Sequence, residues 1–150
     1  MTPDEDPRFL VGSAKSDHLS ICAFRRNHPE CTDFWDGNWL RCRIKVSAGG
    51  LRGEIEADLR AEDFTGLHEG LSKACHELSG QFTFKSMEPW LAFEITGDGR
   101  GHFEMLGDVK EGPAWSNGLR FALRFDQTEI PPMLEGLQRM STSFPVIGRP

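Results

Sequence analysis

The sequence has no long hydrophobic run. No stretch approaches the roughly 20 apolar residues that a membrane-spanning helix needs. The first nine residues, MTPDEDPRF, carry acids and prolines where a secretory signal has a positive end and an apolar run of about 7 to 15 residues. We therefore expect neither a membrane span nor export by the usual secretory route.

An excess of positive charge is also lacking. The formal net charge is −6 and the isoelectric point is near 5.3. Nucleic-acid-binding proteins usually gather Lys and Arg on one face, and anionic membranes attract the same residues. The composition therefore argues against direct contact with nucleic acid or a membrane surface. It leaves a basic protein partner open, although many ordinary soluble proteins carry similar charge.

Cysteine is sparse and shows no paired spacing. The chain has four, without a C-x-x-C motif and without the density of a disulfide scaffold: Cys22, Cys31, Cys42 and Cys75. This usage is typical of reduced thiols in a cytoplasmic protein, so we expect a cytoplasmic location and four free thiols.

Sets of metal ligands are incomplete. His28 with Cys31, and His68 with Cys75 and His76, are the places where a zinc ion would be sought. Neither group supplies the paired spacings of three or four ligands that structural zinc sites show. We expect no metal and no cofactor.

The clearest pattern that is present is a β-hairpin. Apolar and charged residues alternate through 41–47 and again through 51–59, and Gly49 and Gly50 lie between. A Gly-Gly pair suits a two-residue type I′ turn, which needs a positive φ at both central positions. That turn would fix the register by placing Ala48 opposite Leu51.

Three opposite-charge pairs follow from this register: Lys45 with Glu54, Arg43 with Glu56, and Arg41 with Asp58. Each exposed pair would contribute only about 0.2 to 1 kcal/mol, so the pairs specify register more than stability. The other face would carry Cys42, Ile44, Val46 and Ile55, leaving Glu54, Glu56 and Asp58 pointing to solvent.

Further elements complete an α+β fold. Two short strands are expected between residues 9 and 26 with a turn at 15–17, an amphipathic helix over 61–79, four strands within 81–126, and a second helix from about 130 towards 144. We predict a mainly antiparallel sheet of about seven to eight strands with two helices packed on one face. Residues 1–150 would form one domain, with residues 1–7 disordered.

Catalytic signatures are weak. Glu94, Asp98 and Glu104 could serve in acid–base chemistry, but the pattern places Glu94 and Glu104 on a solvent-facing sheet surface. The segment TGDGRG, residues 96–101, joins two strands, and its composition is that of a hairpin turn instead of a phosphate-binding loop. We expect no catalytic residues and no enzymatic activity.

Tryptophans are the more interesting candidates. Trp39 and Trp90 are out of phase with the apolar faces of their strands, and aromatic side chains on polar faces are enriched at protein interfaces. Packing at a sheet edge is the alternative for each of them. The candidate partner-binding residues are Glu54, Glu56, Asp58, Trp39, Trp90 and Trp115.

The stretch DFWDGNWL, residues 33–40, is expected mainly to begin a strand. Asp36, Gly37 and Asn38 are turn formers that would direct the chain into a strand starting near Trp39. Phe34 and Trp35 would pin this entry against the core, and only Trp39 would have a further role.

Three motifs carry a family resemblance. DFWDGNWL, TGDGRGHFE and LRFALRFDQTEIPPML, in this order and spacing, resemble small bacterial proteins grouped with the immunity protein of the WapI wall-associated toxin. The resemblance covers about residues 33–146. It implies a protein that binds a cognate toxin and occludes its active end. The WapI-type toxin is a tRNA nuclease, which would favour an acidic inhibitor. The motifs name no catalytic residue.

Three hypotheses follow. The first is a non-enzymatic, immunity-like protein that presents one charged sheet face to a protein toxin. The second is an enzyme or small-ligand-binding protein with a pocket near the turn from Asp98 to Gly101 or near the loop EGPAWSNG, residues 111–118. The third is a homo-oligomer whose interface is the same strand face. A deep apolar pocket with convergent polar groups would favour the second hypothesis, and a flat charged face the first.

Overall fold

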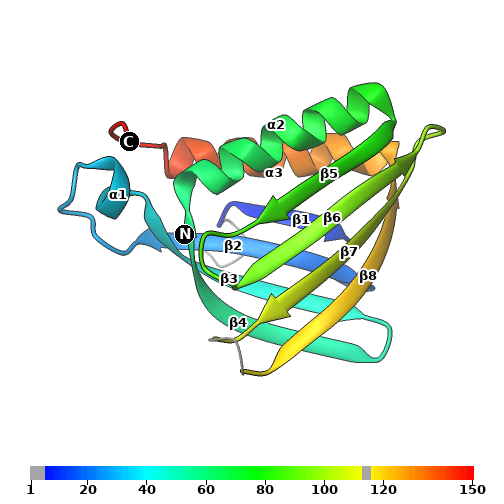
Figure 1. The fold of residues 1–150 in the computed structure, drawn as a ribbon, viewed down its shortest axis with the longest axis horizontal. Coiled ribbons are helices and arrows are strands. Elements are labelled where there is room, and N and C mark those ends of the chain that lie inside the picture. The colour runs from blue at the N-terminus through cyan, green and yellow to red at the C-terminus, as the bar shows by residue number, and fades with distance from the viewer. Residues whose placement is uncertain (1–5, 113–115) are drawn as a thin grey trace.

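The computed structural model describes residues 6–112 and 116–150 and contains two antiparallel sheets of four strands each (Figure 1). Sheet 1 has the order β1-β2-β3-β4 and sheet 2 the order β5-β6-β7-β8. The strands of sheet 1 are β1 (Arg8–Gly12), β2 (His18–Arg26), β3 (Trp39–Ala48) and β4 (Leu51–Arg60). Those of sheet 2 are β5 (Ser79–Lys85), β6 (Leu91–Asp98), β7 (His102–Lys110) and β8 (Gly118–Asp126).

Each sheet is followed by a helix. The helices are α2 (Ala61–Glu77) and α3 (Ile130–Ser143), while α1 (Phe34–Gly37) and the 3₁₀ turn η2 (Gln127–Glu129) are short. The chain therefore repeats one plan, a four-stranded meander and then a helix. The predicted α+β fold with antiparallel strands and two covering helices is confirmed. Its eight strands divide into two sheets, because among the described residues β1–β4 pair only with one another and β5–β8 only with one another.

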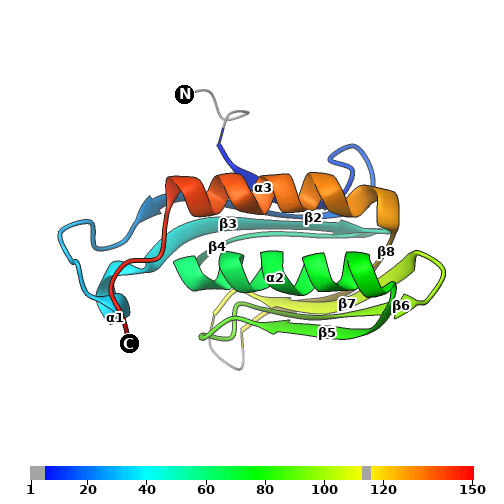
Figure 2. The same cartoon turned by 90° about the horizontal axis from the view of Figure 1, so that it is seen from above.

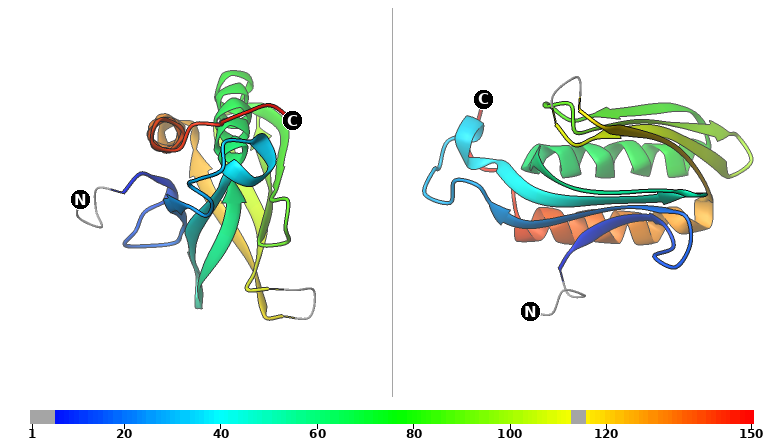
Figure 3. Two further views of the ribbon diagram at one scale, coloured as in Figure 1. Left: turned by 90° about the vertical axis from the view of Figure 1, so that its left-hand side faces the viewer. Right: turned by 90° about the horizontal axis from the view of Figure 1, so that it is seen from below.

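The hydrophobic core lies between the inner faces of the two sheets and the two long helices. Both helices run along one side of the molecule, in opposite directions (Figures 1 and 2), and the end-on view shows the sheets beneath them (Figure 3, left). Phe64, Leu67 and Leu71 of α2 are buried at the predicted three- and four-residue spacing. No helix in the described ranges is long and apolar enough to cross a membrane.

The β3–β4 hairpin has the predicted register. Ala48 pairs with Leu51, and the three predicted charge pairs lie directly opposite one another. The turn type differs from the prediction. Gly49 has a φ of +60°, whereas Gly50 does not adopt a positive φ, which is the pattern of a type II′ turn. Both turns connect the strands with two residues, so the register is the same.

Candidate functional site

The outer face of the β3–β4 hairpin is a ladder of ion pairs. Arg41 contacts Glu56 at 3.0 Å and Asp58 at 3.1 Å, and Arg43 reaches Glu56 at 3.5 Å. Arg43 also lies 3.6 Å from Glu54, and Lys45 lies 3.9 Å from the same carboxylate. The three acids predicted to form one solvent-facing row do so, and basic side chains of β3 pair with each of them.

Arg41 is the centre of the ladder. Its hydrogen bond to Asp58, opposed by desolvation, raises the pKa of the guanidinium, and its hydrogen bond to Glu56 lowers the pKa of that carboxyl. Asp58 also accepts a hydrogen bond from the Asn27 side chain at 2.9 Å, which ties the start of the loop after β2 to the ladder. The charges of this face are thus largely satisfied within the hairpin.

A buried arginine marks the end of the same hairpin. Arg60 is the residue paired with Trp39, and its side chain is only 1% exposed. It donates to the carbonyl oxygens of Trp35 at 2.6 Å and Phe34 at 2.7 Å, and to Glu62 at 2.9 Å. Its guanidinium carbon also lies 4.9 to 5.7 Å from the ring centres of Phe34, Trp35 and Trp39, within cation–π range.

The two tryptophans of the DFWDGNWL stretch differ in environment, and only that of Trp35 contradicts the prediction. Trp35 does not pin the strand entry against the core, because 55% of its surface is exposed. Trp39 begins β3 as predicted, but its ring is half-buried against Arg60. The expected turn is a single helical turn, α1, in which the Asp33 side chain accepts from the Asp36 amide. The one-turn helix turns Trp35 away from the core and towards solvent.

Trp90 and Trp115 do not join the ladder. Trp90 lies just before β6 in the other sheet, half-buried against the core, and its indole Nε1 is buried without a hydrogen-bond partner among the described residues. Trp115 lies outside the described residues, as do its two preceding neighbours, residues 113 and 114. The structure therefore brings together Glu54, Glu56, Asp58 and Trp39, and it places Trp90 at the entry to β6 of sheet 2.

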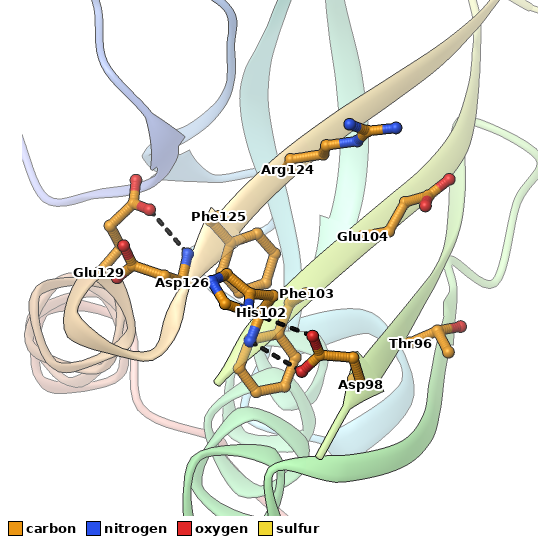
Figure 4. Close-up of a pocket in the computed structure, with 10 residues that line it drawn as sticks. Thr96, Asp98, His102, Phe103, Glu104, Arg124, Phe125, Asp126 and Glu129 are labelled. Atoms are coloured by element: carbon orange, nitrogen blue, oxygen red, sulfur yellow. Dashed lines mark hydrogen bonds and ion pairs between the residues drawn. The ribbon is translucent and has the colours of Figure 1, made fainter. Parts of the chain in front are cut away.

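A pocket of about 570 Å³ lies at the β6–β7 turn, where the sequence offered a ligand site (Figure 4). Its polar lining includes Thr96, Asp98, His102, Glu104, Arg124 and Asp126. The Asp98 carboxylate accepts from the Arg100 and His102 amides and contacts His102 Nδ1 at 3.1 Å, and the first of these bonds is the largest cause of its lowered pKa.

For a polar ligand, the pocket provides several carboxylates, the imidazole of His102 and the guanidinium of Arg124. His102 and Asp98 are exposed, at 75% and 46% of their side chains, so water reaches both groups. Glu104 and Arg124 are direct cross-strand neighbours, and no ion pair joins them in the described ranges. A hydrogen-bonded His–Asp pair orients an imidazole, but a catalytic role also requires a nucleophile or a bound substrate beside it.

One cluster in the described residues could hold a metal ion. Cys31, Asp33 and Asp36 offer ligand atoms that lie within 4.8 Å of one another, and Asp36 belongs to α1 while Asp33 caps it. The sequence pattern pointed to Cys31 with His28, whereas the structure groups Asp33 and Asp36 with the Cys31 thiol. Exposed acids often gather without a metal, so the expectation that the protein binds no zinc stays a prediction. All four cysteines are free thiols in the structure.

Sequence reasoning missed Arg60 and Trp35. The register of the hairpin held a signal for Arg60, because it places an arginine opposite Trp39 at the last pair before α2. Alternation alone predicts that Arg60 is exposed like Asp58. Its burial depends on the α1 backbone, which comes from residues more than twenty positions earlier in the chain.

Fold and surfaces together define a small α+β protein with two antiparallel sheets and charged outer faces. The model of the immunity protein WapI-like family matches residues 9–145, and the chain belongs to this family. The resemblance carried by the three sequence motifs is thereby confirmed. Family membership suggests a toxin-neutralising role and implies a toxin partner, and immunity proteins are generally non-enzymatic.

Among solved structures, the fold is similar to one described as "Crystal structures of trypanosoma bruciei MRP1/MRP2". The TM-score is 0.51 and the sequence identity 11%, and the match covers 92% of this chain and 85% of the other. At this identity the likeness shows the fold alone. No curated protein matches the chain.

Proposed function

We propose that the protein is a non-enzymatic immunity protein that binds a cognate protein toxin in the cytoplasm and occludes its active end. Membership of the immunity protein WapI-like family over residues 9–145 carries this proposal. The free state of all four cysteines agrees with a reducing compartment.

The surface that we propose for the toxin is the outer face of β3 and β4. Its acids are exposed, with 57% of the Glu54 side chain and 46% of the Glu56 side chain open to solvent. The proposed partner-binding residues on this face are Glu54, Glu56, Asp58 and Trp39. Trp90, beside the second sheet, and Trp115 remain proposed as contacts outside it. Trp39 and Trp90 are half-buried, so they would contact the toxin only through the edges of their rings that are exposed.

The proposed toxin is a tRNA nuclease. An enzyme that holds tRNA must present Lys and Arg to phosphates, so an acidic inhibitor is complementary to its active end. The net charge of −6 supports this match.

Coexpression tests the function. The chain is produced together with a WapI-type toxin domain, and growth is compared with that of cells carrying the toxin domain alone. We expect restored growth and a direct complex of the purified proteins. Toxicity that persists at equal protein levels, with no complex detected by calorimetry, would refute the immunity function.

Charge reversal tests the proposed surface. Replacing Glu56 and Asp58 with Lys should slow association with the toxin by about threefold or more at low salt, since charges of this kind steer encounter. The difference should shrink as salt is raised. The matched control is Glu56→Gln with Asp58→Asn, which removes charge without reversing it and should give a smaller change. Identical association rates in all three proteins would exclude this face.

A second candidate function rests on the pocket at the β6–β7 turn. Its volume and its mixture of carboxylates with His102 and Arg124 are those of a site for a small polar ligand. A thermal-shift screen of small polar metabolites tests it. A hit lost in His102→Ala, with toxin binding unchanged, would assign a separate ligand site.

A further inference from the structure

Trp35 stands in a small exposed group at one end of the molecule. The group, here called the Trp35 knob, consists of Glu30, Cys31, Asp33, Phe34, Trp35 and Asp36. It protrudes beyond the strand ends, beside the C-terminal segment (Figure 1). Trp35 exposes 55% of its surface, although large aromatic side chains gain most from burial. A role in binding a partner would explain why Trp35 is exposed.

The knob is held rigidly from below. Arg60 fixes two of its carbonyl oxygens at 2.6 and 2.7 Å, and Asn38 donates to the Phe34 carbonyl oxygen at 2.9 Å. The Phe34 ring lies edge-on to Trp35, with the ring centres 5.0 Å apart. These contacts leave the indole little freedom to lose when a partner covers it, which reduces the entropic cost of binding.

The C-terminal segment adds to this support. The Asn38 side chain also exchanges two hydrogen bonds of 2.9 Å with the backbone of Ile147. The Arg26 guanidinium donates one hydrogen bond to the carbonyl oxygen of Gly37 and another to that of Pro145. Because residues from three distant parts of the chain converge on α1, the knob forms only in the folded protein and in a single orientation.

The charge of the knob is negative and unbalanced. The segment from 27 to 38 has no Lys or Arg, and within the described residues no basic side chain forms an ion pair with Glu30, Asp33 or Asp36. Arg26 and Arg60 donate to carbonyl oxygens of this region instead. Desolvation and then the same three carboxylates raise the pKa of the Cys31 thiol, which agrees with a negative local potential.

The acids of the β3–β4 ladder differ in this respect. Glu54, Glu56 and Asp58 each have a basic partner on β3 within 4.0 Å. Lys and Arg of a partner protein would have to compete with these ion pairs. Within the part of the chain that the structure describes, the acids of the knob have no such ion pairs to give up when they meet a partner's Lys or Arg. The Trp35 knob therefore combines an exposed, preorganised aromatic side chain with unpaired charge of one sign.

We propose that the Trp35 knob is the docking point for a basic protein surface, with Trp35 entering an apolar pocket of the partner and Glu30, Asp33 and Asp36 meeting Lys and Arg around it. Aromatic residues at the centre of a polar rim are the usual arrangement of binding hot spots. This proposal rests on the immunity function, because the basic partner is the toxin. It extends the proposed surface beyond the ladder, since α1 lies at the end of the hairpin where Asp58 and Arg60 stand.

The first test measures toxin binding by variants of the full chain. Trp35→Ala should raise the Kd by about 30-fold or more, mainly through faster dissociation. The matched control is Leu106→Ala, which removes a side chain exposed to 52% from sheet 2 and should leave the Kd within about twofold. Thermal melting establishes that both variants fold.

Charge is tested in the same format. Glu30→Lys with Asp36→Lys should slow association by about threefold or more in a salt-dependent way. Asp33 is kept because its side chain caps α1. The control is Glu135→Lys, a reversal on the exposed face of α3. If the wild type binds the toxin while the knob variants bind as tightly as their controls, the knob proposal is overturned and the immunity function stands.

A second probe tests the knob when the toxin does not bind the wild type. The probe is a phage-displayed library of random 12-residue peptides, selected on the wild-type protein with Trp35→Ala protein as a soluble competitor for binders elsewhere. We expect enrichment of peptides that contain Lys or Arg together with apolar residues. Failure of toxin binding with this enrichment would reject the immunity function alone. Acidic peptides, or no peptides that distinguish the two proteins, would reject the knob.

Discussion

The two ends of the β3–β4 hairpin carry the same kinds of charged residue in very different settings. At the turn end, Lys45 lies 3.9 Å from Glu54, and both side chains are more than half exposed. At the other end, Arg60 lies 2.9 Å from Glu62 and is 1% exposed. Arg41, between them, has pairs of 3.0 and 3.1 Å and is 27% exposed. Ion-pair distance and exposure therefore decrease together along the hairpin.

This gradient separates two uses of charge. Exposed pairs such as Lys45 with Glu54 specify cross-strand register and contribute little free energy, because water solvates both partners. A buried arginine loses its contacts with water, and hydrogen bonds within the protein must offset that loss. The groups that accept these hydrogen bonds are therefore held in place. Here these groups are backbone carbonyl oxygens of α1. The same hairpin thus has solvent-exposed ion pairs at its turn end and, at its other end, a buried arginine that holds the backbone of α1.

The largest expected effect is at Arg60. Arg60→Ala should lower the free energy of unfolding by about 3 to 5 kcal/mol, because it leaves carbonyl oxygens and a carboxylate without their buried donor. Chemical denaturation at neutral pH measures it, and Arg43→Ala, with a half-exposed side chain, is the control that should cost less than about 1 kcal/mol. A loss below 1 kcal/mol at Arg60 would mean that water replaces its contacts and that α1 is not held by this side chain.

An intermediate effect is expected at Asp63, next to the same corner. Burial raises the pKa of this carboxyl from 3.8 to about 6, against the Arg60 amide hydrogen bond that favours the ionised form. A folded-state pKa above the unfolded one means that the favourable contribution of Asp63 is complete below pH 3.8. It is lost as the pH rises through about 6. Ionisation of this carboxyl therefore costs stability at neutral pH.

Asp63→Asn tests this directly. The amide oxygen can still accept from the Arg60 amide, and the variant should be more stable than the wild type by about 2 to 3 kcal/mol at pH 7.5. The two proteins should converge near pH 3.5. Urea unfolding across this range isolates the residue, since carboxyls with lowered pKa values contribute equally to both proteins. A difference that does not change with pH would contradict the raised pKa of Asp63.

The hairpin was predictable from sequence because its information is local. A two-residue loop and strict alternation leave one register, and the three charge pairs follow from it. Helix α2 was predictable for the same reason, since Phe64, Leu67 and Leu71 repeat at helical spacing. The pairing of strands into two sheets was not, because alternation identifies a strand without naming its neighbours.

The Trp35 knob was outside the reach of local patterns. Its exposure depends on Arg60 and on contacts from Ile147 to Asn38, residues 109 positions apart in the chain. The sequence assigns Trp35 to the core as an aromatic side chain at the entry of a strand, and alternation assigns Arg60 to solvent because it continues the polar face of β4. The structure reverses both assignments, and the contacts involved come from distant parts of the chain.

The smallest expected effects lie within the ladder, and they measure the gradient itself. A double-mutant cycle on Arg41 and Asp58 should give a coupling free energy of about 1 kcal/mol, because both side chains are partly shielded and their contact is close. The same cycle on Lys45 and Glu54 should give less than about 0.5 kcal/mol and approach zero at 1 M salt. Since both pairs join the same two strands with one fixed register, strand propensity and topology are matched between the cycles. Equal couplings would show that burial does not set the strength of these pairs, and the division of the hairpin into a solvated end and a braced end would then rest on Arg60 alone.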